Sequence, residues 1–372
     1  MKKIAILTNI ITPYRLSLLN IIAKYYRLDV LVCKENEINR KWKINSHQRF
    51  NIIKLKGFEL TLKNSLNDYR FIYLKFSILF YLIFKKPECL IIGDASFTSY
   101  FAAFLCNVLK IKYIWWNEIL PFTPINKGLV EKMRNYAIKN ASHHFVSGTL
   151  AKKFIQNYGI EDNKISIIPN AIDNQKYFKY YIKYKNQRES LRKKYYILKN
   201  DFVFLYVGQF IERKNIDIIL KSFKQAYDKD KNIKLFLIGG GIKEKEIEKF
   251  IYQNNLNNQI IIKDFLQEDE LSKIYVASDA LLLLSESEPW GMVVNEAMCF
   301  GIPVIVSYKV GAGADLVDEK SGVVVKKYRD IKIVSKILLK VKVKKWSKQY
   351  IQEKILKWNN NLAIERIINI IR

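Results

Sequence analysis

The sequence is short of negative charge and of histidine. Its 372 residues include 35 Asp or Glu against 63 Lys or Arg, and only three His. Its four cysteines form no Cys-x-x-Cys pair and have no histidine close by; they are Cys33, Cys89, Cys106 and Cys299. This pattern excludes a zinc or disulfide framework and predicts buried, reduced thiols. We also find no His, Asp and Cys cluster at metal-ligand spacing, so we expect no metal site.

Long hydrophobic runs are also missing. The most apolar stretch, residues 71–84, has 14 residues with Lys75 inside it, whereas a spanning helix needs roughly 20 apolar residues. The apolar run in MKKIAILTNI at the N-terminus is short, lacks a cleavage signature and continues into a strand-loop-helix pattern. We therefore expect a cytoplasmic protein with neither a transmembrane helix nor a signal peptide.

Positive charge is abundant. The formal net charge is +28, and residues 1–170 alone contain 26 Lys or Arg against 11 Asp or Glu, so the charge is not confined to one tail. Such a surface attracts polyanions, of which nucleic acid and the anionic cytoplasmic leaflet of a membrane are the physical candidates. A nucleic-acid-binding protein is thus one interpretation, although the sequence contains no recognisable nucleic-acid module.

Short apolar, β-branched runs alternate with helical patterns along the whole chain. This alternation is typical of βα units around parallel sheets and predicts an α/β fold. The expected strands of the first half are 4–8, 29–33, 89–92, 112–115, 144–146 and 166–168. Those of the second half are 202–207, 234–238, 260–262, 280–284, 303–306 and 322–325.

A break in this alternation marks the expected domain junction. The segment IIPNAID at 167–173 interrupts the pattern with a Pro-Asn pair, and a very basic tract follows. We expect a Rossmann-like domain over 1–170, a second over 171–344, and C-terminal helices over 345–372 that pack back toward the first domain. Two such domains facing a central cleft would bind ligands beyond the carboxyl ends of their strands.

The loop after the fourth expected strand of the second half carries the strongest chemical signal. It reads SESEPWGMVVNEAMCFGIPVIVS over 285–307, and its Gly291 precedes a helix that begins near Met292. Free backbone N–H groups at a helix start favour a phosphate. Glu288 in the loop and Glu296 about one turn into the helix either accept hydrogen bonds from sugar hydroxyls or, as is usual for glutamates, lie solvated on the surface.

Two further elements follow strands of the second half. Gly208 permits close backbone approach, and Arg213 and Lys214 place two cations at the start of the next helix. These cations either bind phosphate oxygens or form part of a solvated basic face. A glycine triplet at 239–241, with Gly240 at its centre, is a tight turn where the backbone can approach a ligand.

Together these segments resemble glycosyltransferase family 4. EPWGMVVNE at 288–296 resembles the family's E-x7-E donor-binding signature, and the following AMCFGIPVIVS continues the match. GQFIERK at 208–214 resembles its G-x-x-x-x-R-K element, in which Arg and Lys grip the donor diphosphate. KDFLQEDELSKIYVASD at 263–279 resembles the stretch beside the nucleotide base. The resemblance is strong from 168 to 325 and weak in the first half.

The resemblance implies roles for individual residues. Arg213, Lys214 and Glu288 would be catalytic, the two cations by opposing the charge that grows on the leaving diphosphate. Phe265 and Leu266 would contact the base, although ordinary core packing by Phe265 is an equal alternative. The whole donor-binding set implied is Gly208, Arg213, Lys214, Gly240, Phe265, Leu266, Glu288, Trp290, Gly291, Met292, Val293 and Glu296.

The acceptor side is expected in the first domain. Its first strand runs into TNIITPYR, where Thr12 suits the N-cap of a helix and the loop with Asn9 points into the cleft. Arg15 either reaches the donor phosphate or an anionic acceptor, or faces solvent. Many family members carry a histidine after the fourth strand, whereas this chain reads WWNEIL there, with Asn117 or Glu118 as the substitute.

The family implies a metal-independent, retaining glycosyltransferase with the GT-B fold. It would move a sugar from a nucleotide diphosphate sugar, UDP favoured over GDP, to a glycan or lipid-linked acceptor. Bacterial capsule or lipopolysaccharide synthesis is the expected setting, with no cofactor besides the nucleotide-sugar co-substrate and no nucleic-acid partner. A GT-B sugar-nucleotide epimerase is the enzymatic alternative, and a nucleic-acid-binding protein is the non-enzymatic one.

Contact with a membrane is a further expectation. Residues 71–84, with Lys75, Lys85 and Lys86 within or beside them, resemble an apolar helix edged by cations, which suits an anionic membrane surface. The alternative is a core helix under the first sheet whose lysines are merely solvated. We expect peripheral contact with the cytoplasmic face of the inner membrane.

Overall fold

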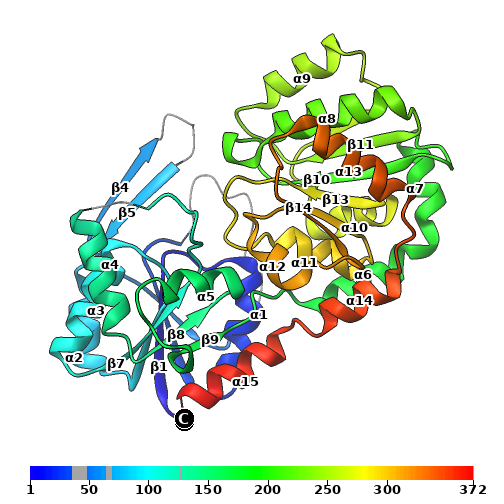
Figure 1. Ribbon diagram of the computed structural model, residues 1–372. Helices are drawn as coiled ribbons and strands as arrows, with labels where there is room; N and C mark the ends of the chain where they lie inside the picture. The colour runs from blue at the N-terminus through cyan, green and yellow to red at the C-terminus, as the bar shows by residue number, and fades with distance from the viewer. Residues whose placement is uncertain (36–47, 64–68, 126–127, 372) are drawn as a thin grey trace. The chain divides into compact units, whose positions relative to one another are not determined.

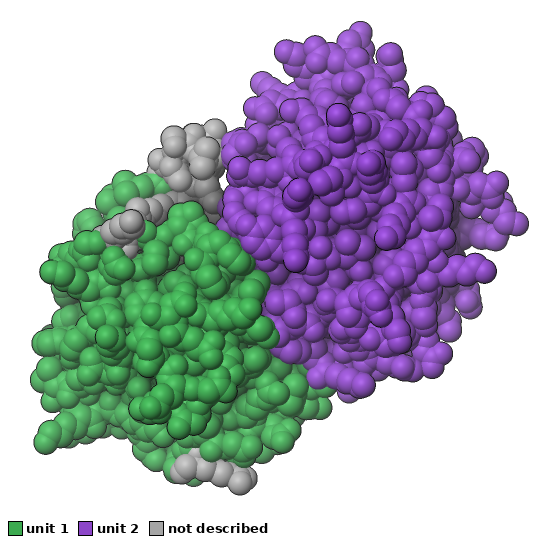
Figure 2. Space-filling model, viewed as in Figure 1, with its two compact units in different colours: residues 1–172, 359–372 green, residues 173–358 purple. Residues whose placement is uncertain are grey.

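The computed structural model contains two compact units (Figure 1 and Figure 2). Unit 1 consists of Met1–Ile172 and Asn359–Arg372, and unit 2 consists of Asp173–Trp358. The structure describes residues 1–35, 48–63, 69–125 and 128–371. In the described part of the chain, no helix is both long and apolar enough to cross a bilayer.

The main sheet of unit 1 has seven parallel strands in the order β3-β2-β1-β6-β7-β8-β9. The order reverses direction between β1 and β6, so the loops after these two strands meet at the carboxyl edge of the sheet. A separate antiparallel pair is formed by β4 and β5. The strands are β1 (Lys3–Thr8), β2 (Arg27–Val32), β3 (Asn51–Lys54), β4 (Phe58–Lys63), β5 (Tyr69–Leu74), β6 (Cys89–Ile92), β7 (Lys112–Asn117), β8 (His143–Val146) and β9 (Ile165–Ile167).

Helices cover both faces of this sheet. Side chains alternate along a strand, so Ile4 and Ile6 of β1 pack on the face that α1 and α15 cover, and Ala5 and Leu7 on the face of α2 to α5 (Figure 1). The helices are α1 (Pro13–Ile22), α2 (Ser77–Lys85), α3 (Phe97–Val108), α4 (Leu129–Lys139), α5 (Thr149–Gln156), the short η1 (Asp162–Lys164) and α15 (Asn360–Ile371).

Unit 2 has a six-stranded parallel sheet in the order β12-β11-β10-β13-β14-β15, which reverses between β10 and β13. Its strands are β10 (Phe202–Val207), β11 (Ile233–Ile238), β12 (Ile260–Lys263), β13 (Ala280–Leu283), β14 (Val304–Ser307) and β15 (Gly322–Val325). Its helices are α6 (Asn174–Tyr184), η2 (Lys185–Gln187), α7 (Arg188–Lys194), η3 (Glu212–Lys214), α8 (Ile216–Lys229), α9 (Glu244–Gln253), α10 (Glu268–Ala277), α11 (Met292–Cys299), α12 (Gly311–Leu316), α13 (Ile331–Val343) and α14 (Lys348–Leu356).

Every strand expected from the sequence is present, and the α/β prediction of two Rossmann-like sheets is confirmed. The prediction of one apolar helix over 71–84 is wrong, because residues 71–74 belong to β5 and α2 begins only at Ser77. Lys75 separates the two elements. It is 4% exposed, and its Nζ lies 2.9 Å from Oε2 of Glu59 on β4, a long-range ion pair that local apolarity does not reveal.

The C-terminal segment, expected over 345–372 as one group of helices, is divided between the units. Helix α14 stays with unit 2, where Gln352 Nε2 donates to the carbonyl of Cys299 at 2.9 Å. Helix α15 packs on unit 1 beside α1, and Arg366 Nη1 donates to the carbonyl of Ile167 at 2.6 Å (Figure 1). The chain therefore passes between the units twice, near residues 172 and 358.

Gly239, which follows β11, is expected to be indispensable for the stability of unit 2. Its φ is +144°, and an added Cβ would lie 1.9 Å from the carbonyl oxygen of Gly208, a backbone atom with no freedom to move alone. Gly239→Ala should therefore destabilise the protein by at least about 1–3 kcal/mol in thermal or urea denaturation.

The neighbouring Gly240 provides the matched control. A Cβ there meets only Asp264 Oδ1, at 3.7 Å, so Gly240→Ala should leave the free energy of unfolding almost unchanged. Equal losses in the two variants would contradict the backbone collision as the cause.

Candidate functional site

Residues from two distant segments meet at the point where the strand order of unit 2 reverses. Lys214 in η3, after β10, forms an ion pair with Glu288 in the loop after β13. Arg213 Nη1 lies 4.0 Å from the same carboxylate and donates to the carbonyl of Ser287 at 3.3 Å. The structure thus brings together the three residues that were expected from the sequence to be catalytic.

The loop that carries Glu288 is held by the segment after β14. Glu288 pairs with Val310 through the bonds Glu288 N to Lys309 O, 3.2 Å, and Gly311 N to Glu288 O, 3.0 Å. A Cβ at Gly311 would lie 2.1 Å from the carbonyl oxygen of Pro289, so this approach requires glycine. The backbone of Glu288 is therefore held by two hydrogen bonds to the segment after β14.

Helix α11 begins directly after this loop, at Met292. Its N-cap, Gly291, has φ +94°, a left-handed conformation that favours glycine, and supplies no side-chain hydrogen bond. The N-cap residue thus provides no side-chain cap for the first amides of the helix, those of Met292 and Val293, and both residues are half-buried. A helix start of this kind binds anions such as phosphate.

Glu296 lies one turn further along α11. Its Oε2 accepts a hydrogen bond of 2.8 Å from the hydroxyl of Tyr275 on α10. Burial raises the pKa of Glu296 to about 7, although hydrogen bonds from Tyr275 and Tyr177 favour the charged form. A carboxyl with this pKa changes charge near neutral pH, unlike an ordinary surface glutamate.

Side-chain exposure separates two of the expected donor contacts. Trp290 is 3% exposed, stacks on Trp358 with ring centroids 5.1 Å apart, and donates from Nε1 to Asn295 Oδ1 at 2.8 Å. The Trp290 side chain therefore belongs to the core, and the expected contact of Trp290 with a donor stays a prediction. Phe265, in contrast, is 42% exposed, which rules out the core-packing alternative, and Leu266 beside it is half-buried.

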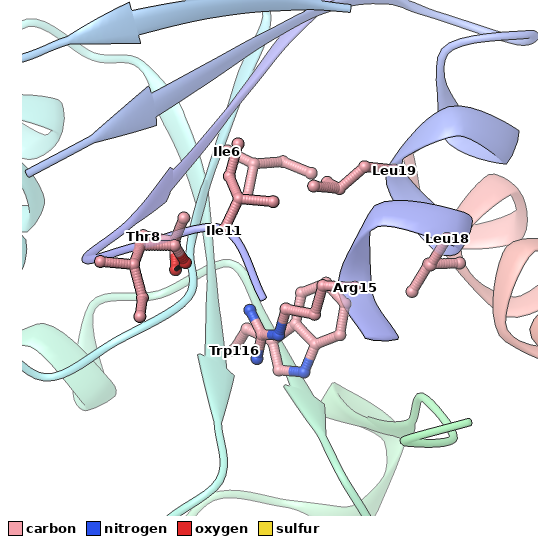
Figure 3. Close-up of a pocket in the computed structure, with 8 residues that line it drawn as sticks. Ile6, Thr8, Ile11, Arg15, Leu18, Leu19 and Trp116 are labelled. Carbon is pink, nitrogen blue, oxygen red and sulfur yellow. Dashed lines mark hydrogen bonds between the residues drawn. The ribbon is translucent and has the colours of Figure 1, made fainter. Parts of the chain in front are cut away.

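Arg15 of unit 1 is neither solvated nor open to an anion. Its side chain lies against the Trp116 ring, with Cζ 4.6 Å from the ring centroid (Figure 3). Its Nη2 donates to Glu118 Oε1 at 2.7 Å. Burial opposes the charge, yet the Glu118 carboxylate raises the pKa of Arg15 above its usual range. The adjoining cavity of about 10 Å³ is the size of one water.

The remaining acceptor-side residues lie at the carboxyl edge of the unit 1 sheet. Asn117 ends β7, is 2% exposed, and donates from Nδ2 to the carbonyls of Ile119 and Ala151 at 3.0 and 3.4 Å. Thr12 is the N-cap of α1, as expected, but makes no side-chain cap bond. Asn9 lies in the same loop.

Asp94, in the loop after β6, was not predicted from the sequence. Burial raises the pKa of its carboxyl, and Arg15 is among the groups that act on it electrostatically. The signal that identifies Asp94 is the strand order, because β6 is the neighbour of β1 at the point where the order reverses.

Metal-binding clusters are not found among the residues that the structure describes, where no three His, Cys, Asp or Glu side chains gather suitably. The sequence has one Asp-Lys-Asp triplet at 228–230, a spacing that can bind a metal. Both of its carboxylates form ion pairs with lysines instead: Asp228 with Lys224 at 2.6 Å and Asp230 with Lys342 at 2.5 Å. Independence from metal stays a prediction.

Comparison with known sequences matches a family model to part of unit 2. Residues 187–356 match the family model of glycosyl transferases group 1. The chain is 29% identical over 185 residues to the capsular polysaccharide biosynthesis glycosyltransferase CapM of Staphylococcus aureus, covering 49% of this chain and 47% of that one. It is 28% identical over 166 residues to the lipopolysaccharide 1,2-N-acetylglucosaminetransferase of Salmonella typhimurium, covering 42% of each. The chain thus spans less than half the length of these two relatives.

Solved structures resemble the whole chain. HepE of Anabaena, in a complex with UDP, has a TM-score of 0.72 at 14% identity over 99% of this chain and 98% of that chain. WaaG, a glycosyltransferase involved in lipopolysaccharide biosynthesis, has a TM-score of 0.63 at 15% identity over 97% and 95% of the two chains. At these identities the likeness shows the fold alone, and the fold is GT-B, as expected.

The raised pKa of Glu296 gives a prediction about stability and pH. Because the folded pKa, about 7, lies above the ordinary value of 4.5, folding favours the protonated form. The resulting stability is complete below pH 4.5 and is lost as the pH rises to 7. Glu296→Gln is neutral at every pH. The stability of this variant relative to the wild type should therefore increase over this interval, and the difference should stay constant at higher pH.

Thermal denaturation of both proteins from about pH 4.5 to pH 8.5 measures this difference. Glu353→Gln, on the exposed side of α14, is the control and should show no such trend. If the stability of Glu296→Gln relative to the wild type decreased as the pH rises, the burial of a protonated carboxyl would be contradicted.

Proposed function

We propose that this protein, whose residues 187–356 belong to glycosyl transferases group 1, moves a sugar from a nucleotide diphosphate sugar to an acceptor hydroxyl. The observation that carries the proposal is the cluster of Arg213, Lys214 and Glu288 beside the uncapped start of α11. It combines two cations, backbone donors and a carboxylate at the carboxyl ends of β10 and β13, where open α/β sheets bind ligands.

The diphosphate of the donor accounts for the positive part of this cluster. The amides at the start of α11 and the two side chains of Arg213 and Lys214 supply hydrogen bonds and charge for phosphate oxygens. In the structure, Lys214 pairs with Glu288. Donor binding would let Lys214 turn to phosphate and leave Glu288 to accept a hydrogen bond from a sugar hydroxyl.

The nucleotide is proposed to be UDP. Phe265 offers an exposed aromatic face after β12, which suits stacking of a base. HepE of Anabaena, whose fold this chain resembles, has been solved in complex with UDP and glucose. Glu296, whose carboxyl is ionised above neutral pH, would accept a hydrogen bond from a donor hydroxyl.

The proposed reaction retains the configuration at the anomeric carbon and needs no metal. The bond from that carbon to the diphosphate oxygen breaks, and the acceptor oxygen attacks from the same face. The departing phosphate takes the proton of the acceptor hydroxyl. Arg213 and Lys214 oppose the negative charge that grows on the diphosphate, the role that a divalent cation plays in other transferases.

The setting is proposed to be the synthesis of a bacterial surface polysaccharide in the cytoplasm. Two relatives are named for capsule and lipopolysaccharide synthesis. Acceptors in such pathways are glycans or lipid-linked sugars, and a protein that acts on the second kind benefits from contact with the membrane.

An exposed apolar surface on unit 1 supports such contact. Phe80 and Phe84 on α2 and Phe104 and Val108 on α3 are all exposed, and the two helices pack side by side (Figure 1). The exposed cations near them are Lys85, Lys86 and Lys110. Apolar side chains edged by lysines fit the interface of an anionic bilayer.

The function is tested by incubating the protein with labelled UDP-sugars and a bacterial membrane extract. We expect transfer of label to the extract, and no loss of rate on addition of EDTA. Lys214→Ala should lower the rate by about 100- to 1000-fold, because a charge that stabilises the leaving diphosphate is lost. The control Lys221→Ala, on an exposed position of α8, should keep the wild-type rate.

Other outcomes of this assay exclude the proposal. Isomerised free sugar nucleotide without transfer identifies an epimerase. Salt-sensitive binding to duplex DNA without any turnover identifies a nucleic-acid-binding protein. A strict requirement for a divalent metal contradicts the role given to Arg213 and Lys214.

Membrane contact is tested by sedimentation with vesicles. Binding should rise with the content of anionic lipid and fall with added salt. Phe80→Ser with Phe84→Ser should weaken it, since both remove exposed apolar surface, whereas Tyr252→Ser, an exposed aromatic of unit 2, should not. Protein that stays in the supernatant with anionic vesicles at low salt contradicts membrane contact.

A further inference from the structure

An open depression lies at the carboxyl ends of β13, β14 and β15 in unit 2. Its volume is about 440 Å³, within the range of roughly 300–1,000 Å³ that is usual for small-ligand sites. Glu286 follows β13, Tyr308 and Lys309 follow β14, and residues 326–330 follow β15. These strands are neighbours in the sheet, and open α/β sheets bind ligands beyond the carboxyl ends of their strands. The position of the depression therefore suits a ligand.

The side chains that line this depression carry more positive than negative charge. The charged residues are Lys309, Lys326, Lys327, Arg329, Glu286 and Asp330. Four cations against two carboxylates leave an excess of two positive charges. Asp330 also caps α13, since its Oδ1 accepts a hydrogen bond from Ile333 N at 3.0 Å. The depression is therefore suited to an anion.

Glu286 is the counter-ion of two of these cations. Its carboxylate forms ion pairs with Lys309 and with Arg329, whose Nη2 lies 2.6 Å from Oε2. The hydroxyl of Tyr328 donates to the same oxygen. Burial opposes the charge, yet these three donors lower the pKa of Glu286 to about 2. Glu286 is therefore ionised at neutral pH and holds both cations at the depression.

The donors that Glu286 does not use belong to Arg329, Lys326 and Lys327. Arg329 contacts Glu286 through Nε and Nη2, at 3.0 and 2.6 Å, and its side chain is 68% exposed. Lys326 and Lys327 are exposed, and the ion pairs found at this depression among the described residues do not include them. Ammonium and guanidinium groups bind carboxylate and phosphate oxygens through charge-assisted hydrogen bonds.

Two tyrosine rings form the apolar part of the depression. The ring centroids of Tyr308 and Tyr328 lie 5.8 Å apart, and Tyr308 is 41% exposed. Lys309 Nζ lies 5.8 Å from the centroid of each ring. An exposed aromatic face beside cations suits a ligand that combines an apolar ring face with an anionic substituent. A sugar that carries a carboxylate or a phosphate has both features.

The depression adjoins the candidate donor site but uses other side chains. Glu286 N donates to Arg213 O at 2.7 Å, and Glu288 N donates to Lys309 O at 3.2 Å, so backbone hydrogen bonds join the two regions. The side chains of Arg213, Lys214 and Glu288 do not line the depression. A ligand in the depression would therefore leave the cations of the donor site in place.

We propose that this depression is a second anion site of unit 2 and that it binds an acidic sugar, a sugar ring that carries a carboxylate or a phosphate. Lys326, Lys327 and Arg329 bind the anionic group, and Tyr308 packs on the ring. The anion site follows from the charges and the shape of the depression. The choice of a sugar as the carrier of the charge rests on the proposed glycosyltransferase function.

Removal of two exposed lysines tests the site. The double variant Lys326→Ala with Lys327→Ala removes two positive charges from the depression. The control, Lys245→Ala with Lys249→Ala, removes the same charge from exposed positions of α9 that do not line the depression. Binding of an acidic sugar should weaken by at least about 10-fold in the first variant and by no more than about twofold in the control.

Glu286→Gln should have the opposite effect. The neutral glutamine leaves Lys309 and Arg329 without their internal counter-ion, so both cations act more strongly on a bound anion. We expect binding of the acidic sugar to strengthen by about 3- to 10-fold. Unchanged or weaker binding in Glu286→Gln contradicts an anion held at these cations.

The probes are glucuronate, glucose 6-phosphate, inorganic phosphate and the neutral methyl α-glucoside. Ligand-observed NMR on the full chain, with UDP at saturation, measures their binding. We expect glucuronate or glucose 6-phosphate to bind more tightly than the other two probes, and the tighter of them identifies the preferred anion. Inorganic phosphate that binds as tightly as both acidic sugars contradicts the choice of a sugar.

Three further results overturn the inference. They are no binding of either acidic sugar to the wild type, displacement of the acidic sugar by UDP, and equal losses in the two double lysine variants. The last would show that net charge alone attracts the ligand.

Titration with UDP alone separates this inference from the proposed function. UDP should bind the wild type and the Lys326→Ala, Lys327→Ala variant equally, because the donor cations are unchanged. Failure of UDP to bind either protein contradicts the proposed function. Normal UDP binding without any binding of an acidic sugar contradicts only the second anion site.

Discussion

The reversal of strand order in each parallel sheet is the constraint on which the candidate sites depend. In unit 2 it places the loops after β10 and β13 side by side, and the ion pair of Lys214 with Glu288 joins them. In unit 1 it places the loops after β1 and β6 side by side, which brings Arg15 over Gly93. In both units, the residues that come into contact are far apart in the sequence.

The two edges differ in how their charges are balanced. In unit 2, two cations, Arg213 and Lys214, face the single carboxylate of Glu288, and a helix start follows the same loop, so the region remains suited to a diphosphate. In unit 1, the guanidinium of Arg15 is matched by the carboxylate of Glu118, so the two charges balance each other.

The sequence by itself determined the alternation of strands and helices, and it singled out the donor-side candidates, because both are local signals. Strand periodicity arises within a few residues, and Glu288 and Glu296 have a fixed spacing along one loop and one helix. The pairing of β4 with β5 was not predicted, because residues 71–74 run on into the apolar residues of α2. Lys75, which separates the two elements, is buried only because Glu59 on β4 neutralises it.

Only the tertiary structure decided which side chains of these segments are buried and which are exposed. Trp290 and Phe265 are both apolar, yet Trp290 lies in the core while Phe265 is exposed after β12, an edge strand. Arg15 is matched by Glu118, 103 residues further along the chain. Asp94 is identified as a candidate site residue only when β6 is known to lie beside β1. Local patterns determine what each segment becomes, whereas the order of strands in the sheet decides which side chains come together.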